Sequence, residues 1–548
     1  MEKPKNWPEG VPHTIEYPEI PIFKMLDESA EKHPEATAII FQDKIITYRE
    51  LKDQVDRFAT ALQNMGVERE DKVALFLPNI PQFVISYYGA LKAGAIVTAI
   101  SPLYKEREVE NQINDSGAET LVVLDLLYPA VEKVKDETGL KRIIVTGFGE
   151  YLPTVKRILG SLLGKIPTHK VDMGEGMHLF QDLLKGYPPT PAPIEVNPKE
   201  DLALLQYTGG TTGLPKGAML THYNLVSNAY MCNAWLKAEE AKEVHVNVLP
   251  LSHIYGMTVT MNNAIASAGA MILIPRFDAK EVLGSIKKYK ASVFGGVPTL
   301  YGALITQPDI SSYDLSSIKF CISGASPLPP EVQNKFMELT GGVLVEGYGL
   351  TEASPVTHAN PLDPTLETVK IGSIGLTWPD TEAKIMHEAS GVELPVDMVG
   401  ELAIRGPQVM KGYWNDPEET AAVLKDGWLY TGDYAKQDED GYFYIVDRKK
   451  DLIKYKGYSV FPREVEDVLY EHPAVKVAAV VGIPDEESGE MPKAFIVLKD
   501  GAEATEEELI EFIRERVAPY KRIRAVEFRD ELPMTLVGKV LKKDLREA

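Results

Sequence analysis

The chain contains very little cysteine. Only Cys232 and Cys321 occur among its 548 residues, and both lie in apolar surroundings. Two isolated thiols cannot build a disulfide framework or a cysteine-rich metal site, so the sequence favours a reducing compartment. Long apolar runs are also missing, since stretches such as 264–274 are shorter than the roughly 20 residues that cross a bilayer. We therefore expect a cytoplasmic protein without a transmembrane segment.

Basic residues are in deficit. The chain has 58 Lys and Arg against 80 Asp and Glu, which gives a net charge of -22. A charge of this sign argues against non-specific attraction to nucleic acid, so a polyanionic ligand needs a dedicated site. The length exceeds what one ordinary core accommodates, and we expect at least two domains, one of them large.

The N-terminal part alternates short apolar runs with amphipathic stretches. Residues 72–77, 120–124 and 142–145 are typical of buried strands, and 271–274 and 318–323 flank a predicted helix over 279–289. A capping-box sequence at Thr47 to Glu50 predicts the start of a helix that Gly66 ends. This alternation predicts an α/β fold of parallel or mixed sheets covered by helices.

The sequence pattern changes near Gly441 to that of a small α+β unit. We predict strands over 442–446, 475–481 and 495–498, and helices that begin at Pro462 and after Thr505. The expected domains are therefore 1–449 and 450–548, with the boundary near Lys450.

A segment rich in glycine and threonine is the sharpest signal. It reads YTGGTTGLPKG over residues 207–217. Small residues leave backbone N–H groups free to surround phosphate oxygens, and a lysine adds positive charge. It is not a Walker A loop, because Pro215 precedes the lysine and Gly217 follows it. We interpret it as a phosphate-binding loop rather than a flexible surface loop. The candidate phosphate ligands are Thr208, Gly209, Gly210, Thr211, Thr212, Gly213 and Lys216.

Four further blocks follow in order along the chain. They are EGYGLTE at 346–352, YTGD at 430–433, DRKKDLIKYKG at 447–457 and PMTLVGK at 533–539. Together with the phosphate loop they closely resemble the adenylate-forming superfamily of acyl-CoA synthetases, luciferases and peptide-synthetase adenylation domains. The resemblance covers almost the whole chain and implies a large N-terminal domain with a small, mobile C-terminal lid.

The resemblance also implies a nucleotide site. Glu352 is expected to bind Mg²⁺ and Thr351 a phosphate, while the Tyr348 ring lies against adenine and Gly349 is a further nucleotide contact. The other implied nucleotide contacts are Gly324, Ala325, Ser326, Asp433 and Arg448. From the residues alone, a capped turn with a solvated Glu352 and a plain strand-to-helix turn at 323–327 stay open.

The last block contributes a lysine. Lys539 follows Gly538 near the C-terminus, where a lysine is usually a solvated surface charge. The resemblance instead implies that it reaches the carboxylate substrate and the α-phosphate. It further implies a hinge at Lys450 and a coenzyme A-binding face with Lys454 and Gly457. The implied catalytic residues are Lys539, Glu352, Thr351 and Lys216.

His253 lies in the segment LPLSHIYGM and is the only histidine in a block that matches the family. The resemblance places it, with Tyr255 and Gly296, in a pocket for the acyl group. A packed histidine without a chemical role stays open, and metal ligation is disfavoured because no paired ligand spacing surrounds it.

The implied activity is a two-step ligation that uses ATP, Mg²⁺ and coenzyme A. A carboxylate is first joined to AMP, and coenzyme A then displaces the nucleotide. Gly209 occupies a position where serine is usual in the superfamily. The glycine form of the loop resembles the fatty-acyl members and favours a fatty acid as the substrate. An aryl or coumarate-type CoA ligase and an enzyme that loads a carrier protein are the alternatives.

Residues 151–170 have leucines, valine and isoleucine on one helical side and basic residues elsewhere. Such a segment fits a peripheral contact with the inner face of a membrane, but a helix packed on the protein surface is the more frequent case. A homodimer also stays open.

Overall fold

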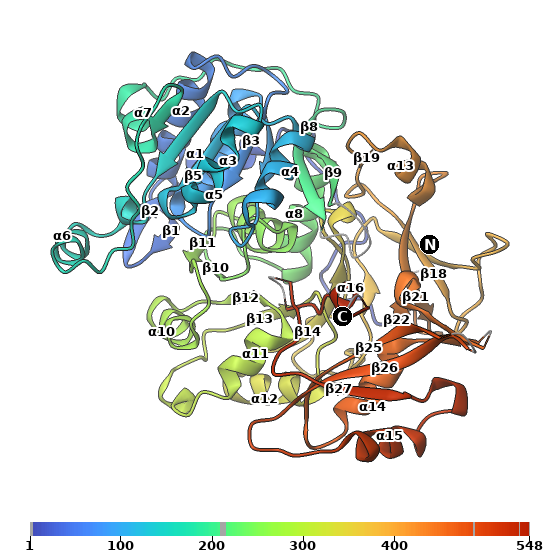
Figure 1. Ribbon diagram of the computed structural model, residues 1–548. Coiled ribbons are helices and arrows are strands. Elements are labelled where there is room, and N and C mark those ends of the chain that lie inside the picture. The colour runs from blue at the N-terminus through green and yellow to red at the C-terminus, as the bar shows by residue number, and fades with distance from the viewer. Residues whose placement is uncertain (1–3, 209–214, 457, 486–487, 536–537, 547–548) are drawn as a thin grey trace.

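The computed structural model describes residues 4–208, 215–456, 458–485, 488–535 and 538–546 (Figure 1). Two large sheets form the N-terminal part. The first has the order β16-β15-β14-β13-β12-β10-β11-β1-β2. Its strands are β16 (Leu376–Thr377), β15 (Val356–Ala359), β14 (Val343–Gly349), β13 (Phe320–Ser323), β12 (Val293–Gly296), β10 (Val244–Asn247), β11 (Ala270–Leu273), β1 (Thr37–Phe41) and β2 (Lys44–Thr47).

The second sheet has the order β19-β9-β8-β4-β3-β5-β6-β7. It is parallel from β8 to β7 and ends in two antiparallel pairs, β8 with β9 and β9 with β19. Its strands are β19 (Gly412–Tyr413), β9 (Lys216–Thr221), β8 (Leu202–Thr208), β4 (Ile96–Ala99), β3 (Lys72–Phe76), β5 (Thr120–Leu124), β6 (Arg142–Thr146) and β7 (Met177–Leu179).

Helices cover both sheets and fill the space between them. The largest core joins β1 and β11 of the first sheet to β3 and β8 of the second through the helices between them, which are α1 (Phe23–Lys32), α2 (Tyr48–Asn64), α3 (Pro81–Ala93) and α8 (His222–Leu236). The outer faces are covered by α10 (Ala279–Tyr289), α11 (Pro298–Ile305) and α12 (Pro330–Thr340) on one side, and by α4 (Glu106–Ser116) and α5 (Tyr128–Glu132) on the other. The expected fold of sheets covered by helices is confirmed.

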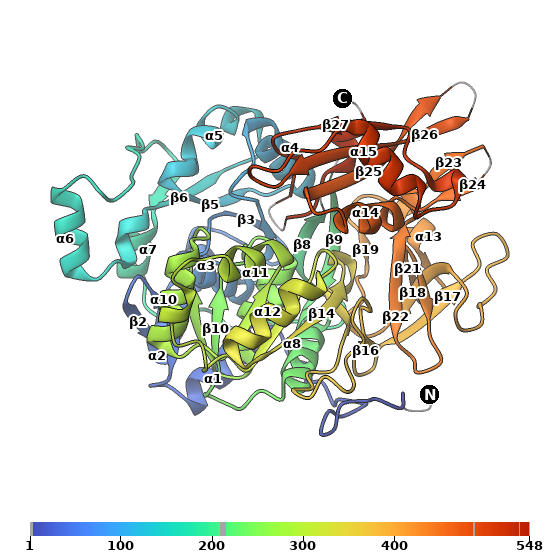
Figure 2. The ribbon, with the colours of Figure 1, turned by 90° about the horizontal axis from the view of Figure 1, so that it is seen from below.

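Two smaller sheets follow. One is antiparallel and contains β17 (Glu382–Met386), β18 (Gly400–Arg405), β20 (Leu424–Lys425), β21 (Trp428–Gln437) and β22 (Phe443–Arg448). The other contains β23 (Ile453–Tyr455), β24 (Tyr458–Val460), β25 (Val475–Asp485), β26 (Gly489–Leu498) and β27 (Ala525–Phe528). With α14 (Pro462–Tyr470) and α15 (Glu506–Arg514) the latter builds its own hydrophobic core. This C-terminal unit, red in Figure 2, packs beside β21 and β22.

Local signals in the sequence are reproduced closely. Thr47 and Glu50 form the capping box of α2, with the Glu50 amide 3.2 Å from Thr47 Oγ1 and the Thr47 amide 2.8 Å from Glu50 Oε2. The predicted helix over 279–289 is α10 with the same bounds, and Thr505 caps α15. Strands differ by a few residues, because β22 runs on to Arg448 and β25 to Asp485.

Both cysteines are buried. Cys232 lies in α8 and Cys321 in β13, and burial raises the pKa of each thiol far above its ordinary value. Among the helices described, none is long and apolar enough to pass through a bilayer.

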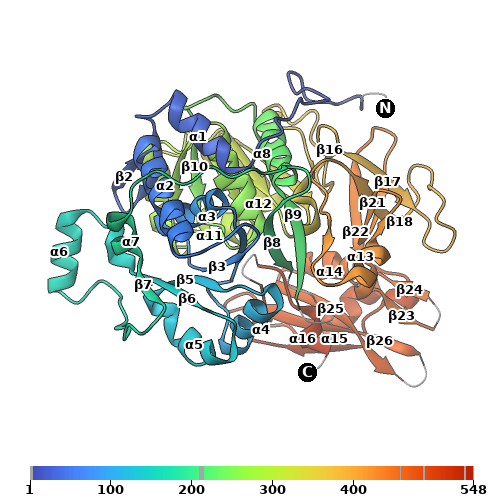
Figure 3. The ribbon, with the colours of Figure 1, turned by 90° about the horizontal axis from the view of Figure 1, so that it is seen from above.

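The segment 151–170 does not pack as a surface helix usually does. Its helix α6 (Thr154–Leu162) stands at the outer edge of the molecule in Figures 2 and 3. The exposed fractions are 69% for Val155, 53% for Leu159, 79% for Leu162 and 64% for Leu163. The more frequent alternative, an apolar face packed against the protein, is therefore wrong.

Candidate active site

The two ends of the predicted phosphate loop lie side by side. Thr208 ends β8 and pairs with Lys216, the first residue of the antiparallel strand β9. Lys216 Nζ lies 2.6 Å from Glu419 Oε1 and 5.4 Å from the centroid of the Tyr413 ring. The loop ligands Gly209, Gly210, Thr211, Thr212 and Gly213 lie outside the residues that the structure describes. The hairpin nevertheless brings the lysine back to the threonine where the loop begins.

Parallel strands bring the second group of predicted residues to one edge. The carboxyl ends of β12, β13 and β14 carry Gly296, the turn 324–326 and Tyr348 in turn, as expected where ligands bind open α/β sheets. The Gly324 amide donates to the Gly296 carbonyl at 3.1 Å. Ala325 adopts a φ of +68°, a turn conformation uncommon for a residue with a side chain. The resulting corner contains Gly324, Ala325, Ser326, Tyr348 and Gly349.

Asp433 and Arg448 face each other across the β21–β22 pair. They are register partners, and Arg448 Nε lies 3.5 Å from Asp433 Oδ1. The Tyr348 hydroxyl donates to Asp433 Oδ2 at 2.5 Å, which links this hairpin to β14. Burial and the Asp433 charge raise the pKa of Tyr348 well above its ordinary value, so the phenol stays a donor. The structure thus joins the predicted adenine and ribose contacts.

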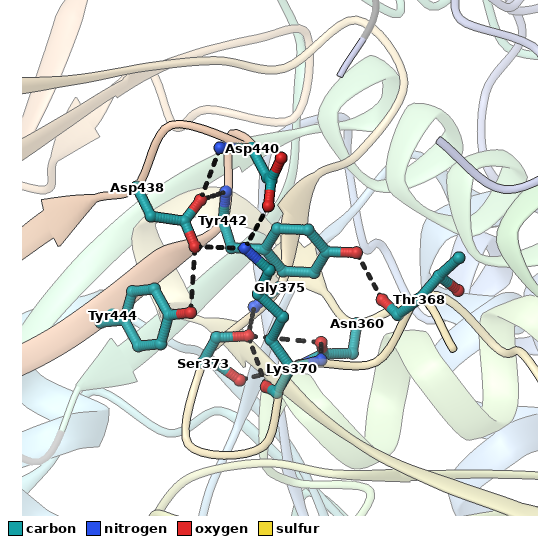
Figure 4. A network of polar contacts seen from close by, with 9 residues as sticks. All are labelled: Asn360, Thr368, Lys370, Ser373, Gly375, Asp438, Asp440, Tyr442 and Tyr444. Carbon is teal, nitrogen blue, oxygen red and sulfur yellow. Dashed lines mark hydrogen bonds and ion pairs between the residues drawn. The ribbon is translucent and has the colours of Figure 1, made fainter. Parts of the chain in front are cut away.

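A lysine network anchors the turn of the same hairpin. Lys370 Nζ lies 2.6 Å from Asp438 Oδ2 and 2.8 Å from Asp440 Oδ2, as Figure 4 shows. The Tyr444 hydroxyl donates to Asp438 at 3.1 Å, and the Tyr442 hydroxyl bonds to the Thr368 carbonyl. These contacts hold the turn between β21 and β22 against the loop before β16, at the end of the hairpin opposite Asp433.

Glu352 lies in the 3₁₀ turn η6 (Thr351–Ala353), just after β14. The Tyr413 hydroxyl donates to Glu352 Oε1 at 2.7 Å. The carboxylate keeps a second oxygen, and the Thr351 hydroxyl is next to it in the chain. One carboxylate and nucleotide phosphates are a donor set that suits Mg²⁺, and the Thr351 hydroxyl is suited to an adjacent phosphate. Within the described part of the chain, no three His, Cys, Asp or Glu side chains cluster as an independent metal site.

Lys539 is brought to this site from the far end of the chain. A Cβ on Gly538 would lie 2.9 Å from Thr299 Oγ1 of α11, so the C-terminal loop lies against the large domain. Burial lowers the pKa of Lys539 well below its ordinary value, Arg448 lowers it further, and Asp433 opposes the shift. The same causes, burial and then Arg448, lower the pKa of Lys450 in η7 (Lys449–Asp451). A lysine predicted only by resemblance thus lies in the electrostatic field of Asp433 and Arg448.

The predicted acyl-pocket residues surround the ends of β12 and β13. The Tyr255 hydroxyl lies 2.8 Å from the Ile322 carbonyl and 3.2 Å from that of Gly296. His253 Nδ1 accepts from the Tyr255 amide at 3.2 Å, and burial lowers the pKa of His253 to about 4. His253 is therefore neutral at physiological pH. A π-helix, η4 (Gly256–Asn262), continues this segment.

The predicted coenzyme A contacts are not gathered with the others. Lys454 lies on β23, at the outer side of the C-terminal unit in Figure 3, and its Nζ bonds to Ser459 Oγ at 2.9 Å. Gly457 falls outside the described ranges.

Three residues at the site were missed by sequence reasoning. They are Tyr413 and Glu419, described above, and Glu346. Glu346 is 6% exposed and accepts from the Leu328 amide at 3.1 Å, and burial raises its pKa to about 7 although Arg463 opposes the shift. Glu346 belongs to the matched block 346–352, which is a signal that could have found it. Tyr413 and Glu419 lie between blocks, and only the tertiary structure reveals their partners.

Comparison with known proteins identifies the family. The model of the AMP-binding enzyme family matches residues 26–414, and that of the AMP-binding enzyme C-terminal domain matches 464–539. The chain therefore belongs to the AMP-binding enzyme family, and the resemblance to adenylate-forming enzymes is confirmed. A long-chain-fatty-acid–CoA ligase of Bacillus subtilis is 47% identical over 100% of this chain and 98% of its own. One of Escherichia coli is 40% identical over 95% and 93%.

Solved structures agree with this assignment. The ATP-bound crystal structure of MatB from Rhodopseudomonas palustris covers 96% of this chain and 98% of its own at 29% identity, with a TM-score of 0.84. The apo crystal structure of the same protein has the same coverage and identity but a TM-score of 0.74. The arrangement described here is thus more similar to the ATP-bound form.

Proposed function

We propose that the chain is a fatty-acid–CoA ligase that forms AMP. The observation that carries this proposal is the meeting of Tyr348, Asp433, Arg448 and Lys539, from three separate parts of the chain, in a protein 47% identical to a long-chain-fatty-acid–CoA ligase over its full length. ATP and coenzyme A are the co-substrates of such ligases.

In the first step a carboxylate oxygen of the acid attacks the α-phosphorus of ATP, and the bond to the β-phosphate oxygen breaks. Asp433 accepts hydrogen bonds from ribose hydroxyls, Arg448 donates to the same sugar, and Tyr348 lies against adenine. Lys216 and the phosphate loop bind the departing pyrophosphate, while Lys539 reaches both the carboxylate and the α-phosphate. Such preorganised donors are each worth about 10² to 10³ in rate.

Mg²⁺ fits this site as a cofactor. Glu352 supplies the carboxylate oxygen that would hold it beside the phosphates, and the Thr351 hydroxyl would donate to an adjacent phosphate oxygen. When bound, the ion neutralises charge on the phosphate oxygens.

In the second step the coenzyme A thiol attacks the acyl carbonyl and AMP leaves. A lysine that covers the adenylate during the first step would occupy space that coenzyme A must enter, so we propose that the C-terminal domain, residues 450–548, rotates about Lys450 relative to 1–449. This rotation would present Lys454 and Gly457 to coenzyme A. The greater similarity to the ATP-bound than to the apo form of MatB supports the view that the described arrangement serves the first step.

The two steps can be tested separately. Lys539→Ala is expected to lose pyrophosphate exchange by about 10² to 10³ yet convert a supplied acyl-adenylate to the thioester. Lys450→Pro fixes φ at the hinge, so it should keep exchange and lose thioester formation. Loss of both steps alike in both variants would refute this division.

The acid itself is tested with a panel of substrates. We expect pyrophosphate release with aliphatic acids and little with benzoate- or coumarate-type acids. A preference for aromatic acids would establish the aryl ligase instead, and acyl transfer to a carrier protein but not to coenzyme A would establish the loading enzyme.

We also propose that α6 contacts an anionic membrane surface from the cytoplasmic side. Its apolar side chains are exposed, and residues 151–170 contain Lys156, Arg157, Lys165 and Lys170 with no Asp or Glu, in a chain of net charge -22. Apolar exposure combined with local positive charge suits an interfacial helix on anionic lipid. A fatty acid dissolved in the bilayer would then lie close to the enzyme.

Vesicle co-sedimentation tests this contact. Replacing Leu159, Leu162 and Leu163 by Ser should abolish binding to phosphatidylglycerol vesicles, while the exposed pair Val392→Ser and Val396→Ser should not. Unchanged binding would overturn the proposal. A concentration-dependent dimer that the leucine variant alone disrupts would assign the face to a second copy of the chain.

A further inference from the structure

A short segment crosses the candidate active site that the reaction scheme does not use. Residues 410–420, here called the strap, contain β19 and the start of α13 (Pro417–Val423). The Met410 amide donates to the Glu352 carbonyl at 2.8 Å, and the Trp414 amide to the Gly217 carbonyl at 2.7 Å. The strap therefore joins the turn that carries Glu352 to the strand that begins with Lys216.

Tyr413 lies between the side chains of Glu352 and Lys216. Its hydroxyl donates to Glu352 Oε1 at 2.7 Å, its ring centroid is 5.4 Å from Lys216 Nζ, and the residue is 8% exposed. From this buried position, the Tyr413 hydroxyl is a hydrogen-bond donor that occupies one of the two Glu352 oxygens.

Glu419 is the negatively charged partner of Lys216. Its Oε1 is 2.6 Å from Lys216 Nζ, with both side chains partly exposed. Its backbone is held in the first turn of α13, because the Glu419 amide donates to Asp416 Oδ1 at 3.0 Å. The Tyr413 amide donates to Thr420 Oγ1 at 2.8 Å, which ties that turn to β19. The carboxylate is therefore presented to the lysine from a constrained position.

We propose that Glu419 is the counter-ion that the ATP phosphates displace from Lys216, and that Tyr413 is a positioning residue that orients Glu352 toward its metal. The inference rests on the proposed ATP-dependent function. A polyphosphate carries more negative charge than one carboxylate and can replace Glu419 as the partner of the Lys216 ammonium group. The strap meanwhile keeps Glu352 and Lys216 at a fixed separation. The ion pair between Glu419 and Lys216 then lowers the affinity for ATP, but it holds the Lys216 side chain in position before ATP binds.

Calorimetric titration with ATP in the absence of acid tests the counter-ion. Glu419→Gln should bind ATP about two- to fivefold more tightly, the range expected for a partly exposed ion pair. Glu418→Gln, an exposed carboxylate on the same turn, is the matched control and should bind as the parent does. In a Lys216→Met background the effect of Glu419→Gln should vanish. Equal or weaker binding by Glu419→Gln, or an effect that persists without Lys216, would overturn the proposal.

Tyr413→Phe tests the positioning role, since it removes the hydroxyl and keeps the ring. Binding of Mn²⁺ to the enzyme with a non-hydrolysable ATP analogue, measured by electron paramagnetic resonance, should weaken about tenfold. Affinity for the analogue without metal should change less than twofold. Equal weakening of nucleotide and metal binding, or no change in either, would contradict it. If the parent protein does not bind ATP, the proposed function fails; if it binds and these variants behave as the parent does, only the present inference fails.

Discussion

The hydroxyl of Tyr348 and the carboxylate of Asp433 are joined by a hydrogen bond of 2.5 Å between β14 and β21. This contact connects the first large sheet to the hairpin that carries Arg448. It gives the proposed ribose site one fixed carboxylate oxygen and leaves the other facing Arg448.

Asp433→Asn should therefore raise the KM for ATP about 10- to 100-fold, because hydrogen bonds to charged groups contribute about 1.5–3 kcal/mol. The KM for the acid should change little. Steady-state pyrophosphate release gives both constants, and the exposed Asp426→Asn is the control. An unchanged KM for ATP would remove Asp433 from the nucleotide site.

Glu346 predicts a pH dependence of stability. Burial raises its pKa from an ordinary 4.5 to about 7, so the folded state binds this proton more tightly than the unfolded chain does. Between pH 4.5 and pH 7 the contribution of Glu346 to the free energy of unfolding therefore falls as pH rises, by at most about 3 kcal/mol.

Glu346→Gln removes this titration and keeps an acceptor for the Leu328 amide. Its stability relative to the parent should grow from pH 5 to pH 8 in urea unfolding. Parallel stability curves for the two proteins would show that Glu346 does not titrate in this window.

Lys370→Met should destabilise the β21–β22 turn, because Asp438 and Asp440 would lose their shared cation. We expect a loss of about 1–2 kcal/mol, more than the 0–1 typical of a single surface pair. Chemical unfolding measures it, with the exposed Lys335→Met as control. A loss of stability no larger than that of the control would show that the network contributes no more than a single surface ion pair.

Gly296→Ala tests the tight packing at the end of β12. A Cβ there would lie 2.9 Å from the Tyr301 ring, whereas one on Gly302 would meet no atom within 4 Å. Overpacking of this kind costs about 1–3 kcal/mol. Gly302→Ala in α11 should be neutral or stabilising by up to about 1 kcal/mol. Similar unfolding curves for the two variants would show that the Tyr301 ring moves aside freely.

Local elements were predictable because their causes are local. The Thr47 capping box and the apolar spacing of 279–289 each lie within a few turns of chain, and the structure reproduces both. The pairing of Thr208 with Lys216 is also local, since they are eight positions apart on one hairpin, but this hairpin was not predicted from the sequence.

The remaining features depend on contacts between distant residues. Tyr413 reaches Glu352 across 61 positions of sequence, and the pKa of Glu346 depends on burial that periodicity does not reveal. The exposure of α6 was also not predictable, because its amphipathic spacing is the same whether the apolar face is covered or left open. Lys539 was found only through resemblance, since its own surroundings in sequence suggest a surface charge.

The burial of Cys232 and Cys321 has a chemical consequence for a catalyst of this type. A mixed anhydride of an acid and AMP is a strong electrophile, and any accessible thiolate nearby would compete with the incoming cofactor for the acyl group. The thiols of both cysteines are kept protonated inside the protein, and Cys321 lies in the strand β13 that ends beside Tyr255. The two cysteines of the enzyme are thereby protected from acylation, and they do not compete with the thiol of coenzyme A for the activated acid.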